Sequence, residues 1–75
     1  MHPKRHLFFI TQNYSYSILR PLQAAIRTRG GEVAWFLSGK ELNYDYLRED
    51  EWRIHSVEEA IQFSPDACYA PGDVI

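Results

Sequence analysis

Residues 7–37, which read LFFITQNYSYSILRPLQAAIRTRGGEVAWFL, are the stretch that decides the fold. Two short apolar runs bound it, and each is typical of a strand buried on both faces, as in a parallel sheet. Between these runs the apolar side chains recur at helical spacing, on a single stripe. The pattern predicts three elements, a strand at about residues 6–11, a helix at 18–29 and a strand at 32–38. A connection of this kind joins parallel strands.

The two ends of the predicted helix carry signals of their own. We expect Ser15 or Ser17 to be the N-cap, because a serine hydroxyl accepts a free N–H of the first turn. Pro21 then falls in the first turn, where its missing N–H is tolerated. Gly30 and Gly31 end the helix, since glycine readily takes the left-handed cap conformation.

The rest of the chain continues the alternation of elements. Residues 40–51 are compatible with a short helix or an irregular arm, and both stay open. Further patterns predict a strand at 52–55, a helix at 57–63 after an N-cap at Ser56, a strand at 66–70 and a turn at 71–73. The order β-α-β-β-α-β predicts an α/β fold, a small Rossmann-like unit with a mainly parallel sheet of about four strands and two or three helices. We expect strand order 3-2-1-4 and a core centred on Phe8, Ile10, Leu22, Ile26, Val33, Trp35, Leu37, Ile61 and Tyr69.

Length and composition limit the chain to one small domain. It has 75 residues, of which 45% are hydrophobic, and ends on Val74 and Ile75 directly after the predicted turn. We therefore expect a single, partial Rossmann-like domain over residues 1–75, cut from a longer chain. No apolar run approaches the roughly 18 residues that span a bilayer, and no signal peptide is recognisable, so we expect a cytoplasmic protein.

Charge divides the sequence in two. Residues 1–40 carry six basic side chains and one acid, whereas residues 41–75 carry two basic side chains and nine acids. A basic half attracts phosphate, nucleic acid or an anionic membrane, but we favour solvated helix faces and mutual attraction of the two halves. The acid run at residues 49–51 is expected to solvate a loop. A pI of about 5.8 and the lack of a known motif argue against nucleic acid as a partner.

Ligands of open parallel sheets bind beyond the carboxyl ends of the strands, where the strand order reverses. This rule points to the loop after the first strand, and its candidate acceptor-binding or anion-binding residues are Thr11, Gln12, Asn13, Ser15 and Ser17. Hydroxyls and a helix N-terminus suit a phosphate or carboxylate. The simpler alternative is that Asn13 and the serines only form a turn and a cap. No Gly-x-Gly-x-x-Gly or Walker sequence is present, so a tightly held dinucleotide or triphosphate is not expected.

Other reactive side chains give no further site. His2, His6 and His55 do not fall at ligand spacing, so no metal and no cofactor is expected. Cys68, the only cysteine, is expected to be a small buried residue in a strand. Four tyrosines are expected to complete the core unless they prove exposed, namely Tyr14, Tyr16, Tyr44 and Tyr46.

Two parts of the sequence together resemble a known family. They are the strand-helix-strand stretch, from LFFITQNY to GEVAWFL, and PDACYAPGDV at residues 65–74. They resemble the start of a CDP-glycerol glycerophosphotransferase-like protein, a GT-B-type transferase related to the enzymes that polymerise teichoic acid. The resemblance implies two Rossmann-like domains around a cleft, the N-terminal one facing the acceptor and the C-terminal one holding the CDP-linked donor. The catalytic His-Gly pair of that family does not occur in this sequence, so no catalytic residue is assigned.

The resemblance also implies a function. The full-length protein would transfer glycerol phosphate from CDP-glycerol to a phosphate-containing acceptor, a cell-envelope polymer, while this fragment alone would be inactive. It would act in the cytoplasm, and peripheral association with the inner face of the membrane stays open. The competing hypothesis is a free-standing small α/β binding or interaction module.

Overall fold

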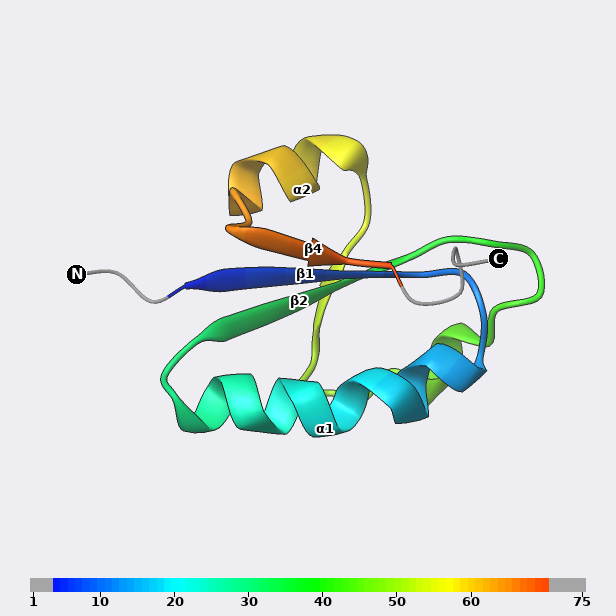
Figure 1. The fold of residues 1–75 in the computed structure, drawn as a ribbon. Helices are drawn as coiled ribbons and strands as arrows, with labels where there is room; N and C mark the ends of the chain where they lie inside the picture. The colour runs from blue at the N-terminus through cyan, green and yellow to red at the C-terminus, as the bar shows by residue number, and fades with distance from the viewer. Residues whose placement is uncertain (1–3, 71–75) are drawn as a thin grey trace.

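The structure, a computed structural model, describes residues 4–70, so the predicted turn at 71–73 and the final apolar pair lie outside the described residues. The elements in chain order are β1 (Arg5–Ile10), α1 (Tyr14–Thr28), β2 (Glu32–Leu37), the 3-10 helix η1 (Tyr44–Tyr46), β3 (Trp52–Ile54), α2 (Val57–Phe63) and β4 (Ala67–Tyr69) (Figure 1). The predicted α/β class and order of elements are confirmed. Residues 40–51 form an irregular arm that contains one short 3-10 helix.

The sheet has four strands in the order β3-β2-β1-β4, as predicted, and every pair is parallel. β1 and β2 pair along their whole length, from Arg5 opposite Glu32 to Ile10 opposite Leu37. The chain moves from β1 to β2 in one direction and from β3 to β4 in the other. Because both crossovers follow the right-handed rule, α1 and α2 lie on opposite faces of the sheet (Figure 1). We call these the α1 face and the α2 face.

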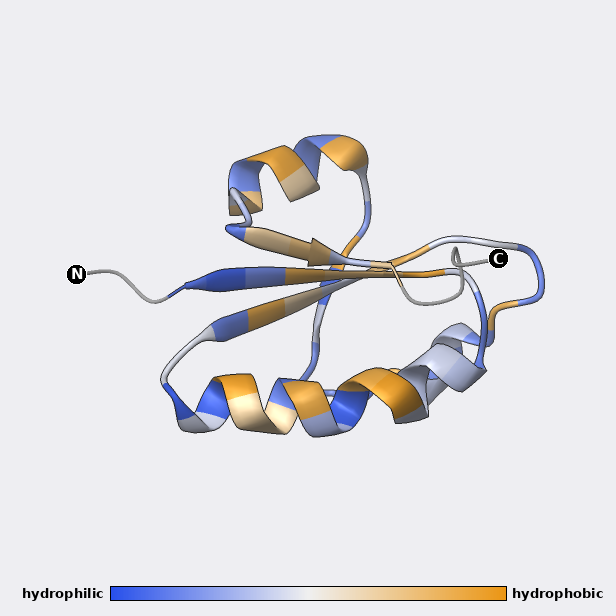
Figure 2. Ribbon diagram, in the orientation of Figure 1, coloured by the Kyte–Doolittle hydropathy of each residue, from blue (hydrophilic) through white to orange (hydrophobic). Residues whose placement is uncertain are grey.

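The α1 face holds the larger core. Its buried side chains are Phe8, Ile10, Tyr16, Leu19, Ile26, Val33, Trp35, Leu37 and Leu42. The indole of Trp35 is fully buried, and Phe8 meets it edge-on at a ring-centroid distance of 5.0 Å. Leu22 and Tyr69, both expected in the core, pack against this cluster but are only partly buried. Figure 2 shows the apolar middle of β1 and β2 between the two helices.

The α2 face is smaller, and two predictions fail there. Its buried cluster consists of Leu7, Ala34, Ile54 and Phe63. Ile61 was expected in the core but is 71% exposed, because the short α2 turns Ala60 and Phe63 inward and leaves Ile61 on its outer side. Cys68 was expected to be buried but is exposed, since it lies on the edge strand β4.

The start of α1 also differs from the prediction. The helix begins at Tyr14, four residues early, and its N-cap is Asn13, whose side chain makes no capping hydrogen bond. Ser15 and Ser17 therefore lie inside the helix, and the prediction that one of them caps it is wrong.

Pro21 consequently lies in the helix interior rather than in the first turn. A proline there removes one backbone hydrogen bond at a cost of about 3 kcal/mol. Tyr16 and Leu19 are 2% and 4% exposed, and burial of these two side chains stabilises the longer helix. Tertiary packing thus outweighs the local serine and proline signals and places the helix start earlier in the chain.

A buried polar network ties the irregular arm to α1. Glu51, expected in a solvated loop, has a side chain only 1% exposed and accepts hydrogen bonds from Arg20 Nη2 at 3.0 Å, Gln23 Nε2 at 2.8 Å and the Arg48 N–H at 2.8 Å. Gln23 in turn accepts a hydrogen bond from Trp35 Nε1 at 2.8 Å. The network joins α1, β2 and the arm, and every buried polar group in it has a hydrogen-bond partner.

Electrostatics in this network favour the charged carboxylate. Burial of Glu51 by itself favours the neutral acid, but the hydrogen bonds from Arg20, the Arg48 N–H and Gln23 outweigh it, so the pKa of Glu51 lies below its ordinary 4.5. Asp50, next to it, is exposed and pairs with Arg27 at 3.1 Å. Both ion pairs join the basic half of the chain to the acidic half.

Only one of the four tyrosines completes the core. Tyr16 is 2% exposed and donates its hydroxyl to the Asn43 carbonyl at 3.0 Å. Tyr14, Tyr44 and Tyr46 are exposed, so the expectation that they complete the core is wrong. The two in η1 pack at the rim of the core, because Tyr46 meets the Tyr16 ring edge-on at 5.7 Å, while Leu42 and Leu47 of the arm reach into the cluster.

Candidate functional site

The predicted site lies where β1 and β2 end, and there two loops meet closely. Gly39 has a φ of +127°, and a Cβ at this position would lie 3.2 Å from the carbonyl oxygen of Thr11. Asn13 bridges the loops, because its Oδ1 accepts the Asn43 N–H at 2.6 Å and its Nδ2 donates to the Glu41 carbonyl at 3.2 Å. This carboxyl edge is therefore a defined surface held by side-chain hydrogen bonds and by a glycine contact.

The structure gathers only part of the predicted residue set on that surface. Thr11 is half-buried, while Gln12 and Asn13 are exposed beside it. Ser15 is fully buried, and the Ser17 hydroxyl donates to the Tyr14 carbonyl at 3.0 Å. Thr11 and Gln12 thus offer side chains to a ligand at this edge, while the Asn13 amide is occupied by the neighbouring loop.

Part of the helix N-terminus is also occupied. The Ser15 N–H donates to the Gln12 carbonyl at 3.1 Å, and the Tyr16 N–H donates to the Asn13 carbonyl at 3.3 Å. An anion at this helix end therefore meets fewer available N–H groups than an uncapped first turn presents.

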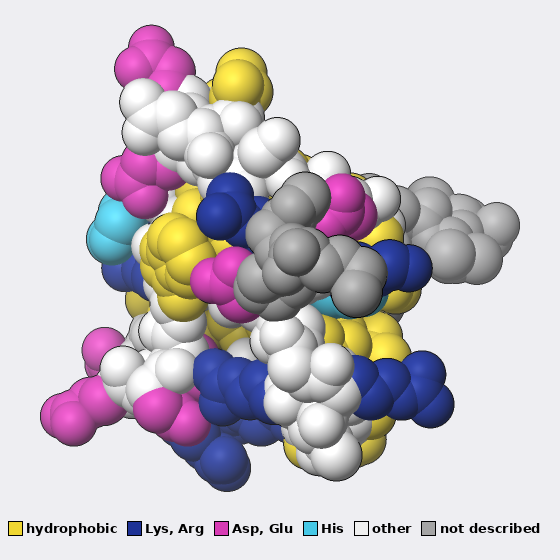
Figure 3. All heavy atoms as spheres, turned by 90° about the vertical axis from the view of Figure 1, so that its left-hand side faces the viewer, with side chains coloured by type: hydrophobic (Ala, Val, Ile, Leu, Met, Phe, Trp, Pro, Cys, Tyr) yellow, Lys and Arg dark blue, Asp and Glu magenta, His cyan; other side chains and the backbone are white. Residues whose placement is uncertain are grey.

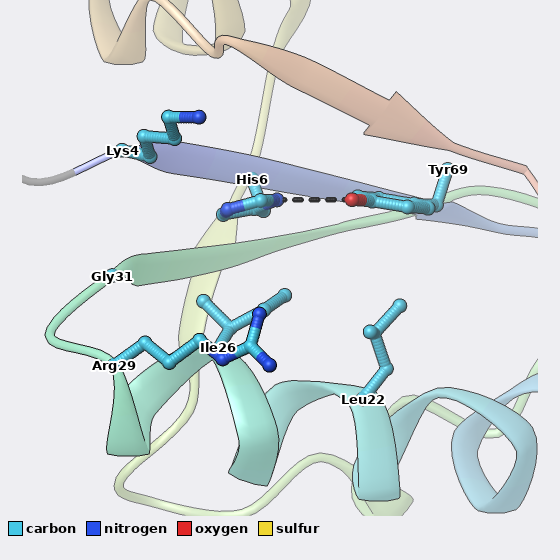
Figure 4. A pocket seen from close by; sticks show the side chains of 7 residues that line it. All are labelled: Lys4, His6, Leu22, Ile26, Arg29, Gly31 and Tyr69. Atoms are coloured by element: carbon cyan, nitrogen blue, oxygen red, sulfur yellow. Dashed lines mark hydrogen bonds between the residues drawn. The ribbon is translucent and has the colours of Figure 1, made fainter.

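A cavity of about 340 Å³ lies at the opposite end of the sheet, and no sequence pattern predicted it. It is lined by Lys4, His6, Leu22, Ile26, Arg29, Gly31 and Tyr69 (Figure 4). The cavity exists because α1 packs on β1 and β2, while β4 extends the sheet beyond the helix. Its lining comes from β1, α1 and β4 and from three flanking residues, Lys4, Arg29 and Gly31, which only the strand order brings together.

A pair of aromatic rings forms one wall of this cavity. His6 Nδ1 and the Tyr69 hydroxyl lie 3.1 Å apart, and the two rings are nearly parallel, with centroids 5.8 Å apart. Phe8 packs edge-on against the Tyr69 ring at 5.4 Å, which fixes the ring from below. The wall is therefore rigid and carries polar atoms at its surface.

The mouth of the cavity is basic. Lys4 and Arg29 both line it, and no Asp or Glu does. Figure 3 looks onto this end of the molecule and shows Lys and Arg side chains gathered across its lower half, over α1. The cavity combines a basic mouth, an aromatic wall and the apolar side chains of Leu22 and Ile26, and this combination suits an organic anion.

A second hollow, of about 320 Å³, lies on the α2 face, but its charged groups are engaged. Arg5 Nη1 donates to the Phe63 carbonyl at 2.8 Å, and Arg5 Nε pairs with Glu32 at 3.4 Å. Arg5 here connects β1 to the end of α2, which is a structural role.

Two kinds of site find no support in the described chain. Across residues 4–70, no three His, Cys, Asp or Glu side chains gather where they would hold a metal ion. Over the same residues no helix has the length and apolarity needed to cross a bilayer. Comparisons of the chain with protein families, curated proteins and solved structures found no match.

Proposed function

We propose that this chain is the acceptor-side domain of a transferase that moves glycerol phosphate from CDP-glycerol to a phosphate-bearing acceptor of the cell envelope. The sequence likeness of residues 7–37 and 65–74 to that family motivates the proposal. The observation that carries it is the parallel order β3-β2-β1-β4, which reverses direction beside β1. Open α/β sheets bind ligands at such a reversal, beyond the carboxyl ends of the strands.

In this proposal the domain binds and orients the acceptor. Thr11 and Gln12 contact it at the carboxyl edge, and the positive end of the α1 dipole favours its phosphate. Because the sequence holds no His-Gly pair, donor binding and proton transfer fall to other parts of the transferase. Positioning of this kind supplies a large part of the rate in two-substrate reactions.

The test is an NMR titration of the ¹⁵N-labelled 75-residue chain with glycerol phosphate and, separately, with CDP-glycerol. We expect glycerol phosphate to shift the amides of residues 11–17, and CDP-glycerol to bind weakly and not to be turned over. Gln12→Ala should weaken the response to glycerol phosphate, whereas Gln62→Ala, an exposed glutamine on α2, serves as the control. Micromolar binding of CDP-glycerol would contradict the proposal. So would amides of residues 11–17 whose chemical shifts do not change when glycerol phosphate is added.

The second candidate is a free-standing small α/β binding module. The cavity beside α1 favours it, because β1, α1 and β4 together form a ligand-sized cavity within this one domain. Such a module unfolds in one cooperative transition and binds its ligand without a second domain. Urea unfolding of the 75-residue chain without a cooperative transition would eliminate this candidate and leave the transferase proposal.

A further inference from the structure

The cavity beside α1 contains basic groups that the fold itself does not use. Arg5, Arg20 and Arg27 each form an ion pair with an acid. Lys4 and Arg29 form no ion pair with any residue in the range 4–70. Both side chains are exposed, so solvent neutralises them in the free protein, and an anion bound at the cavity would replace that solvent.

The end of α1 does not need the Arg29 side chain as a cap. The last carbonyls of the helix, on residues 25–27, accept the backbone N–H groups of Arg29, Gly30 and Gly31 at 2.9–3.3 Å. A basic side chain near a helix C-terminus often binds these carbonyls, but here the backbone has satisfied them. The guanidinium of Arg29 is therefore available to a ligand.

Gly31 brings the backbone of Lys4 close to the end of α1. A Cβ at this position would lie 2.6 Å from Ile26 Cγ2 and 3.3 Å from the carbonyl oxygen of Lys4. The Gly31 backbone thus lets the end of α1 approach the start of β1 closely. This contact puts the start of β1 beside the end of α1, so Lys4 and Arg29 both line the cavity, with His6 between them in the view of Figure 4.

His6 supplies a third polar group. One of its ring nitrogens is engaged with the Tyr69 hydroxyl, and Figure 4 shows the other nitrogen turned away from Tyr69, toward the end where Lys4 lies. When Tyr69 donates its hydroxyl hydrogen to Nδ1, the proton of neutral His6 resides on Nε2, which then becomes a donor. Leu22 and Ile26 line the side of the cavity that belongs to α1.

We propose that this cavity binds a phosphate monoester with a small apolar or aromatic body. The phosphate would lie at the rim between Lys4, Arg29 and His6 Nε2, and the body would pack on Leu22 and Ile26. A dianionic phosphate matches two cations and one N–H donor better than a single carboxylate does. A volume of about 340 Å³ is at the lower end of ligand sites, which run from about 300 to 1,000 Å³.

This site is separate from the acceptor surface and does not depend on the proposed function. It lies at the amino end of β1, whereas residues 11–17 lie beyond its carboxyl end. A titration therefore reports the two sites through different amides.

The test uses phenyl phosphate as the probe and the ¹⁵N-labelled 75-residue chain as the protein. We expect saturable chemical-shift changes of the amides of His6, Ile26 and Tyr69. Inorganic phosphate should bind more weakly, because it lacks the phenyl ring that packs on Leu22 and Ile26. Arg29→Gln should weaken phenyl phosphate by about tenfold, the effect of losing one charge-assisted hydrogen bond. Lys4→Gln, also at an exposed residue, replaces this variant if Arg29→Gln fails to fold.

Arg27→Gln is the matched control, because it removes the same charge from the same helix but from a side chain that pairs with Asp50. It should change the affinity by less than about twofold, as expected of a charge outside the contact. Equal weakening by Arg27→Gln and Arg29→Gln would overturn the proposal, since it would indicate unspecific attraction. So would equal affinities for phenyl phosphate and inorganic phosphate, or shifts confined to residues 11–17.

Discussion

The two faces of the sheet are covered by helices of very different length, and the face with the longer helix has the larger buried core. On the α1 face a helix of 15 residues takes part in a cluster of nine buried apolar residues, and the Glu51 network holds the arm beside it. On the α2 face a helix of seven residues covers four. Phe9 and Phe36 meet there edge-on at 5.5 Å but remain only partly buried.

The comparison teaches where the stability of such a small domain resides. A chain of this size is stable by roughly 4–11 kcal/mol, at about 0.05–0.15 kcal/mol per residue. The long α1 leaves Phe8 of β1 fully buried, whereas under the short α2 the neighbouring strand residues Phe9 and Phe36 stay partly exposed. We therefore expect equal substitutions on the two faces to have unequal costs.

The largest effect is expected from one pair of neighbours in β1. Phe8 is fully buried on the α1 face, and Phe9 is half-buried on the α2 face. Phe8→Ala should lower the free energy of unfolding by about 3–5 kcal/mol, which leaves the domain barely folded. Phe9→Ala should cost about half of that or less, because less of its surface leaves water on folding. Urea unfolding followed by circular dichroism measures both, and equal losses would remove the distinction between the faces.

The polar network gives the next largest effect. Glu51→Gln keeps the shape of the side chain but removes the charge that Arg20 and Gln23 contact. The free energy of unfolding at neutral pH should fall by about 1.5–3 kcal/mol, the worth of hydrogen bonds to a charged group. Glu49→Gln, at an exposed residue of the same acid run, is the control and should change it by less than about 0.5 kcal/mol. Similar losses in the two variants would mean that the network contributes only long-range charge.

Acid should erase the advantage of wild type over Glu51→Gln. The pKa of Glu51 in the folded chain lies below the ordinary 4.5, so the unfolded chain takes up this proton first as the pH falls. The stabilisation is complete above pH 4.5 and is lost as the pH falls through the lower pKa of the folded state. Unfolding curves of both proteins, measured at neutral pH and at several values below 4.5, should converge. A difference in unfolding free energy that stays constant would show that the ionised carboxylate is not the source.

The smallest effect concerns the open part of the α2 face and involves no loss of stability. Cys68 is exposed on β4, so a maleimide should react with it in the folded protein at a rate close to that in urea. A thiol covered by a helix would react only after local opening, and therefore orders of magnitude more slowly. Protection of that size in the folded protein would mean that the α2 face is closed, and the contrast with the α1 face would weaken.

Of the candidate sites, only the one at the carboxyl edge was accessible to sequence reasoning. The loop at residues 11–17 follows from the parallel order and the rule for ligand position, even though Ser15 proved buried. The cavity beside α1 left no signal, because Lys4, Arg29 and Tyr69 are far apart along the chain and meet only after β4 pairs with β1.

The sequence by itself determined the order of elements, the parallel sheet and most of the α1-face core, because the apolar runs of the strands and the 3.6-residue period of the helix are local properties of the chain. Tertiary structure alone decided where α1 begins, which tyrosines are buried and that Glu51 is enclosed. Its partner Arg20 lies 31 residues away, and a carboxylate in an acid run looks solvated until that distant guanidinium is brought against it. Burial on the short α2 is likewise decided by which side of the helix faces the sheet: Ile61 has an apolar side chain, yet it lies on the outer side of α2.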